Sequence, residues 1–146
     1  MNAAPLVSAR PSVLRRLGPP LAALAAAAVP TVYLAVVDPN APGHYPTCPF
    51  LAATGWWCPG CGGLRCVHAL AHGDLSGALH DNAAAVLLFA VLALLWVRWV
   101  WAALTGGPAP RVALGARRWA LVALLVLVFT VVRNLSVGVG LAPPLI

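Results

Sequence analysis

Three long apolar runs constrain this chain more than any other feature, and they cover residues 17–37, 83–104 and 119–139. Each run holds roughly 20 residues, and a helix of that length spans about 30 Å, the hydrocarbon thickness of a bilayer. The chain is 62% hydrophobic and 8% charged, whereas a soluble domain is about half apolar and a quarter charged. The sequence therefore predicts an all-α membrane protein with three transmembrane helices.

The segments between these runs are predicted to form one domain with them. Residues 1–16 are expected to be a cytoplasmic tail, residues 105–118 a Gly/Pro-containing cytoplasmic loop, and residues 140–146 a short C-terminal tail. Residues 38–82 contain all four Cys, all four His and all three Asp. One or two short interfacial helices are expected there, with Gly73 ending one helix and Asp74 capping the next.

The arginines predict the orientation in the membrane. Six of them lie before the first run or between the second and third: Arg10, Arg15, Arg16, Arg111, Arg117 and Arg118. Arg98 lies near the same end of the second run. The cysteine loop has only Arg65, so positive-inside bias places the N-terminus in the cytoplasm of a plasma membrane, with the cysteine loop and the C-terminus outside. No basic stripe interleaves with aromatics, which argues against nucleic acid as a partner. A cleaved signal peptide ending near Ala28 is the competing interpretation of the first run.

Four cysteines within residues 48–66 allow three interpretations of the loop. Pairing Cys48 with Cys58 or Cys61 gives a structural disulfide, which suits an oxidising compartment. The pair Cys58 and Cys61, separated by two residues, also fits a redox-active dithiol. A zinc site is the third interpretation, because Cys-Pro-x-Cys-Gly is the turn of a zinc knuckle. Its ligands would be Cys58 and Cys61 with two of a further set: Cys48, Cys66, His68 and His72.

Two further polar features stand out in apolar surroundings. At 100° per residue a helix over residues 61–72 would place Cys61, Arg65, His68 and His72 on one face. That face lines a pocket or faces water. Arg133 lies towards the outer end of the third run, where a charge is costly. It is expected either to snorkel to the interface or to pair with one of the three aspartates.

The order of these motifs resembles domain-of-unknown-function family 2752, a family of small bacterial membrane proteins. The resemblance covers residues 48–95 and rests on eleven shared positions: Cys48, Pro49, Gly55, Cys58, Pro59, Cys61, Gly62, Arg65, Gly73, Asp74 and Asn82. The chain departs from the family pattern at Leu64 and Cys66, where the family usually has Thr and a small apolar residue. The resemblance implies a shared unit of three cysteines and assigns no activity.

The sequence thus predicts an integral membrane protein whose outer cysteine loop is structural or binds a partner. A thiol-redox protein using Cys58 and Cys61, or a zinc-binding module, is the alternative. An enzyme is the less favoured class, because the chain has three Asp and no Glu for acid–base chemistry. Besides lipid, the expected partner of so thin a bundle is a second copy or another membrane protein.

Overall fold

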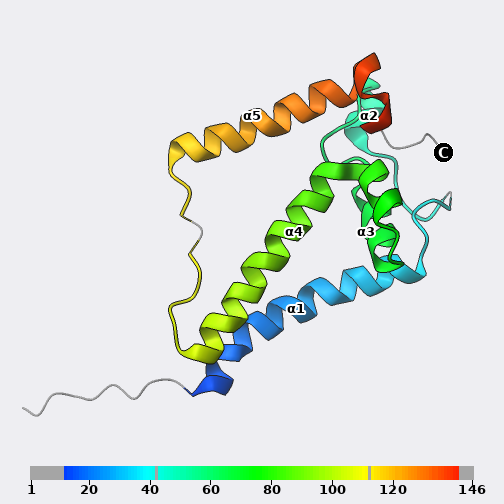
Figure 1. Ribbon diagram of the computed structural model, residues 1–146. Coiled ribbons are helices and arrows are strands. Elements are labelled where there is room, and N and C mark those ends of the chain that lie inside the picture. Colours follow the sequence, from blue (N-terminus) through cyan, green and yellow to red (C-terminus); the bar gives the residue numbers. More distant parts are fainter. Residues whose placement is uncertain (1–11, 42, 112, 142–146) are drawn as a thin grey trace, which may run out of the picture.

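The computed structural model describes residues 12–141 except positions 42 and 112. The regular elements of this part of the chain are all helices, with no strand, which confirms the predicted all-α class. In chain order the elements are α1 (Val13–Val36), α2 (Pro49–Thr54), α3 (Gly63–Ala71), α4 (Leu75–Thr105), α5 (Ala116–Arg133) and the 3₁₀ helix η1 (Ser136–Leu141). α1 and α4 are the two long elements, and α3 packs against both of them (Figure 1).

The helices α1 and α4 converge at the end where α1 begins and α4 finishes (Figure 1). There the indole Nε1 of Trp96 donates a hydrogen bond of 2.9 Å to the carbonyl of Pro20. α1 begins at Val13 rather than at residue 17, so Arg15 and Arg16, expected in the tail, are helical. Arg and Leu are good helix formers, and this extends the helix ahead of its apolar stretch.

A kink at Asn82 divides α4 into the two helical pieces that the sequence predicts. Asn82 has φ −163° and ψ 91°, outside the helical region, and its side-chain oxygen accepts a hydrogen bond of 3.0 Å from the amide of Ala85. Before the kink, Asp74 caps the first piece by accepting 2.8 Å from the amide of Gly77. Gly73 ends α3 with φ 77°, a conformation that glycine adopts at little cost. The cap at Asp74 and the helix end at Gly73 confirm the local predictions.

The third apolar run differs from its prediction. α5 ends at Arg133 instead of continuing to residue 139, and its 18 residues include Arg117 and Arg118 as well as Arg133. Two helices of the described residues, α1 and α4, are long and apolar enough to cross a membrane, rather than the expected three. The helix stops early because Arg133 and the residue after it turn towards the cysteine loop and bond its backbone.

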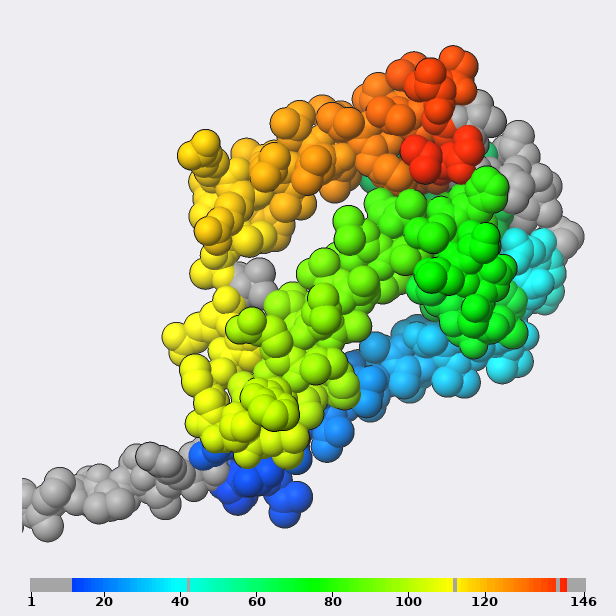
Figure 2. Space-filling view, viewed as in Figure 1, coloured from blue at the N-terminus to red at the C-terminus, as the bar shows by residue number. Residues whose placement is uncertain are grey.

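Few side chains are buried in this arrangement. α5 diverges from α4 away from the cysteine loop (Figure 2), and large apolar side chains along α1, α4 and α5 are exposed. The two largest fully buried side chains are polar, Arg133 and Asn82, each 1% exposed. Both side chains lie beneath the cysteine loop, so the largest buried side chains of the described residues are those that contact this loop.

Candidate metal centre

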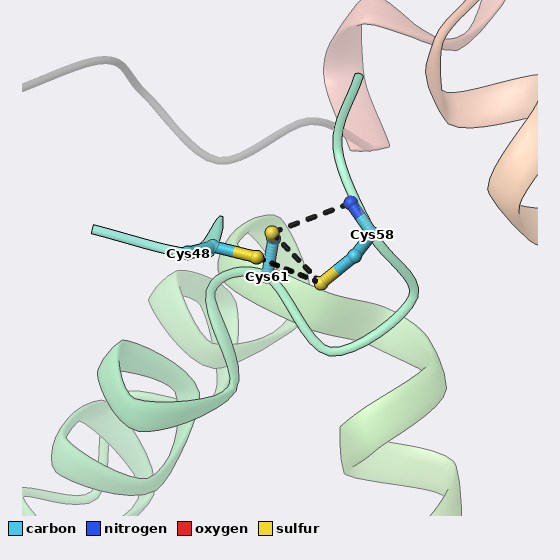
Figure 3. A group of neighbouring side chains, drawn as sticks. All are labelled: Cys48, Cys58 and Cys61. Atoms are coloured by element: carbon cyan, nitrogen blue, oxygen red, sulfur yellow. Dashed lines mark hydrogen bonds between the residues drawn. The ribbon is translucent and has the colours of Figure 1, made fainter. Parts of the chain in front are cut away.

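Three cysteine thiols converge in the loop between α1 and α4. The sulfur atoms of Cys48, Cys58 and Cys61 all lie within 4.8 Å of one another, and the three side chains point together (Figure 3). The Cys58 and Cys61 sulfurs are 2.9 Å apart, and those of Cys48 and Cys58 are 3.5 Å apart. All four cysteines are free in the structure, so the disulfide of the first interpretation is absent from it.

Local backbone chemistry brings these thiols together. Cys48 is the N-cap of α2, with Pro49 as the first helical residue, where its missing N–H costs nothing. Cys58 and Cys61 lie on a tight turn in which the Cys61 amide donates 3.1 Å to the Cys58 carbonyl. The Cys58 amide points at the Cys61 sulfur at 3.3 Å.

Side chains from α4 and α5 hold the carbonyls of this turn. Arg133 donates from Nη1 to the Cys58 carbonyl at 2.9 Å and from Nη2 to the Cys61 carbonyl at 3.2 Å. Asn82 donates from Nδ2 to the carbonyls of Pro59, at 2.9 Å, and Cys61, at 3.0 Å. Its cap to Ala85 uses the other side-chain atom, so one amide both starts the helix and fixes the turn.

Asn134 fixes the residue ahead of the turn. Its Oδ1 accepts 2.7 Å from the Trp57 amide, and its Nδ2 donates 2.9 Å to the Trp57 carbonyl. Because both backbone groups of Trp57 are bonded to a single side chain, Trp57 cannot rotate without breaking both bonds. The turn from Cys58 to Cys61, called the thiol turn below, is therefore held by Asn134 at the residue before it and by Arg133 at its carbonyls.

The environment shifts the acidities of two of the three thiols in opposite directions. Burial raises the pKa of Cys61 to about 12, and hydrogen bonds with the Cys58 and Cys48 thiols add to this. The pKa of Cys48 is lowered, first by the backbone amide of Leu51 at the start of α2. Outside the group, burial raises the pKa of Cys66. The group thus combines a thiol that ionises readily with one that keeps its proton.

The other expected ligands lie elsewhere. Cys66 is fully buried, with its sulfur 3.8 Å from the Asn82 carbonyl. His68 turns to the end of α1, where its Nδ1 is 2.7 Å from the Leu34 carbonyl and its Nε2 is 3.7 Å from Asp38. The Nδ1 of His72 lies 2.9 Å from the His68 carbonyl. The predicted polar face of residues 61–72 is therefore divided. Cys61 joins the group of three thiols, whereas His68 contacts the end of α1.

The sequence predicted either of two roles for Arg133, snorkelling to the interface or pairing with an aspartate, and the structure shows a different set of partners. Arg133 lies beneath the cysteine loop, as one interpretation expected, yet among the described residues no carboxylate forms an ion pair with it. Its partners are backbone carbonyls and the ring of Phe129, 5.0 Å from the guanidinium carbon. Asn134, which bonds Trp57, follows Arg133 directly in the sequence. The one available signal was the adjacency of two large polar residues where a helix ends.

Comparison with known proteins places the motif in one family. No curated protein and no solved structure matches the chain. Residues 48–96 match the model of a family described as "Protein of unknown function (DUF2752)". This stretch contains all three converging cysteines and Asn82, whereas Arg133 and Asn134 lie outside it. The match confirms the resemblance drawn from the motif residues, and it covers residues 48–96 of the 146-residue chain.

Proposed function

We propose that this chain is an integral membrane protein that binds a thiophilic metal ion, zinc in the first instance, on the thiolates of Cys48, Cys58 and Cys61. The observation that carries the proposal is the convergence of three sulfurs from two separate turns within 4.8 Å. A tetrahedral zinc with Zn–S bonds of about 2.3 Å sets its sulfurs about 3.8 Å apart. The separations of 2.9 Å between Cys58 and Cys61 and of 3.5 Å between Cys48 and Cys58 lie within about 1 Å of that spacing.

The charge beneath the thiols supports a metal–thiolate centre. The Arg133 side chain is 1% exposed, and its Nε has no hydrogen-bond partner. A buried cation without an anion is strongly unfavourable. A divalent ion with three thiolates carries a net charge of −1, which would neutralise the guanidinium. Arg133 would in turn orient the turn that presents Cys58 and Cys61 to the ion.

Membrane insertion rests on α1 and α4. Both are long and apolar enough to cross a bilayer, and most of their large apolar side chains are exposed. Arginines cluster at the end of the helix pair away from the cysteine loop, which favours a cytoplasmic location for that end and an outer location for the loop. Residues 134–141 would share the side of the loop, since Asn134 bonds Trp57 and His80 lies 3.1 Å from the Gly140 carbonyl. A second copy or another membrane protein beside α5 stays a prediction.

Metal analysis of the purified full-length chain tests the proposal. The chain is purified in detergent under reducing conditions, and zinc is measured per chain by mass spectrometry. We expect one zinc in the wild type and none above background in Cys48→Ala or Cys61→Ala. Cys66→Ala is the matched control, because Cys66 is equally buried but lies outside the group. A wild type without zinc, or a Cys61→Ala variant that retains it, would contradict the proposal.

The structure also favours one second candidate, a redox dithiol. The Cys58 and Cys61 sulfurs lie 2.9 Å apart, and Cys58 is the more exposed of the two. α3 begins only at Gly63, after the motif, so its N-terminus is not directly at Cys58. If this candidate holds, the wild type carries no metal, and Cys58 and Cys61 close a disulfide that thiol–disulfide buffers open reversibly. Zinc-free protein with such a titration would replace the metal proposal.

A further inference from the structure

Two histidines at the end of α3 form a pair that the thiol group does not use. His68 lies in the last turn of this helix, and His72, four residues later, is its C-cap. Their ring centroids are 4.3 Å apart, and the ring planes are tilted by 39°. Two histidines at this spacing on one helical face can bind the same divalent metal ion.

Backbone carbonyls determine which ring nitrogens are available to such an ion. The Nδ1 of His68 lies 2.7 Å from the Leu34 carbonyl, and the Nδ1 of His72 lies 2.9 Å from the His68 carbonyl. Because a carbonyl oxygen can only accept a hydrogen bond, Nδ1 carries the proton in each neutral ring and Nε2 keeps its lone pair. A hydrogen bond from the other ring nitrogen to a carbonyl is the usual support of a metal-ligating histidine.

A carboxylate lies beside one of these lone pairs. The Oδ1 of Asp38 is 3.7 Å from the Nε2 of His68, which is too far for a hydrogen bond. Two ligand atoms about 2.0–2.1 Å from a tetrahedral zinc ion are about 3.4 Å apart, so an ion fits between these two atoms with little movement. The pKa of Asp38 is lowered, first by the hydrogen bond from the Asn40 amide, and the nearby histidines His68 and His72 add to this. The Asp38 side chain is therefore an anion at neutral pH.

We propose that Asp38, His68 and His72 form a second metal site, which takes zinc or a similar divalent transition-metal ion on two imidazole Nε2 atoms and one carboxylate oxygen. Imidazole and carboxylate are donors that zinc accepts, whereas the group of three thiols favours softer ions. The second site shares no ligand with the thiol group, so it does not depend on the function proposed above.

This second site is the more open of the two and the weaker. Among the described residues only the three cysteines bring their ligand atoms within 4.8 Å of one another, so an ion at the second site must draw its ligands together. Asp38 and His72 are exposed and free to move, whereas the His68 side chain is only 19% exposed and is the fixed member. Ordering two exposed side chains costs conformational entropy. We therefore expect the ion to be lost during purification and to return when zinc is added.

Equilibrium dialysis of the full-length chain in detergent against micromolar zinc tests the second site. We expect the wild type to bind one zinc more than it retains on purification. His72→Gln should lose this further zinc, because glutamine is polar but has no ring nitrogen. His80→Gln is the matched control and should bind as the wild type does. The Nδ1 of His80 also lies near a carbonyl, that of Gly140 at 3.1 Å, but His80 has no histidine four residues away.

Nitrogen-15 NMR of the wild type, labelled at histidine, checks the ligand atoms without any variant. Zinc should shift the Nε2 signals of His68 and His72 and leave their Nδ1 atoms protonated. A wild type that takes up no further zinc, a His72→Gln variant that binds as much as the wild type, or shifts confined to other histidines would each overturn the inference.

The same dialysis separates the second site from the thiol centre. Cys48→Ala should lose the zinc that the wild type retains on purification and still take up the further one. A wild type that retains no zinc on purification but binds one in dialysis, lost in His72→Gln, would refute the thiol centre and support the second site.

Discussion

Replacing Arg133 by methionine tests the link between the fold and the proposed centre. Methionine preserves the unbranched apolar stem but removes the charge and both hydrogen bonds to the Cys58 and Cys61 carbonyls. In the metal-free chain, the free energy lost with these bonds is offset, because the substitution also removes a buried cation that has no anionic partner. In the metal-bound chain there is no such offset, because there the positive charge of Arg133 balances the negative charge of the thiolates.

The size of the effect follows from the contacts. A hydrogen bond from a charged donor contributes about 1.5–3 kcal/mol. Both carbonyls keep a second donor, the Cys61 amide at 3.1 Å for Cys58 and the Asn82 amide at 3.0 Å for Cys61, so the loss is at the lower end. We expect zinc affinity to fall by about 10–100-fold, or about 1.4–2.8 kcal/mol, as is usual when a residue that orients a ligand is removed.

Competition with a chromophoric chelator in detergent measures this affinity. Arg118→Met is the matched control, because Arg118 is an exposed arginine on the same helix and should leave the affinity unchanged. Thermal unfolding of both variants without metal should differ little from wild type. The reasoning fails if Arg133→Met binds zinc as tightly as the Arg118→Met control.

Four other perturbations have expected outcomes. Asn82→Ala removes a helix cap and two hydrogen bonds to the turn, so it should lower the free energy of unfolding by about 2–4 kcal/mol in a denaturant titration. A loss below about 1 kcal/mol would refute the double role of Asn82 as helix cap and support of the turn. Gly62 has φ 81°, so Gly62→Ala should cost about 1 kcal/mol in the same assay, and no loss would contradict it. Zinc affinity should rise with pH through neutrality, because the raised pKa of Cys61 means that zinc must displace the proton of this thiol. An affinity that does not change with pH in the chelator assay would argue against this. Trp96→Phe removes the bond to Pro20 and should lower the unfolding temperature by a few degrees, for about 1 kcal/mol, and an unchanged temperature would count against that contact.

Local chemistry explains what the sequence could predict. The caps at Asp74 and Asn82 and the helix end at Gly73 depend on neighbours within a few residues, and each is present. The apolar runs that became α1 and α4 are likewise local signals. The turn at Cys58 was predicted from the spacing of Cys58 and Cys61, whereas the unit of three cysteines was implied only by the family resemblance.

Contacts between distant residues explain what the sequence could not predict. Arg133 bonds a carbonyl 75 positions earlier in the chain, and no spacing rule connects the two. Counting apolar residues predicted a third span through residue 139, whereas the helix ends at Arg133. Such a count does not show that Arg133 and Asn134 bond the backbone of the cysteine loop. The two histidines were placed near the thiols by helical phase alone, whereas the end of α1 supplies a carbonyl and a carboxylate that hold His68.

The support of the thiol turn also sets an order for the biogenesis of the centre. Cys48, Cys58 and Cys61 leave the ribosome well before Arg133 and Asn134, which follow the turn by more than 70 residues. Until α5 is made and docks, the turn lacks those two partners and is held only by its own backbone hydrogen bond and by Asn82. A chain truncated before α5 would therefore carry the three thiols on a less constrained turn, and we expect the proposed centre to take up its metal after α5 has docked.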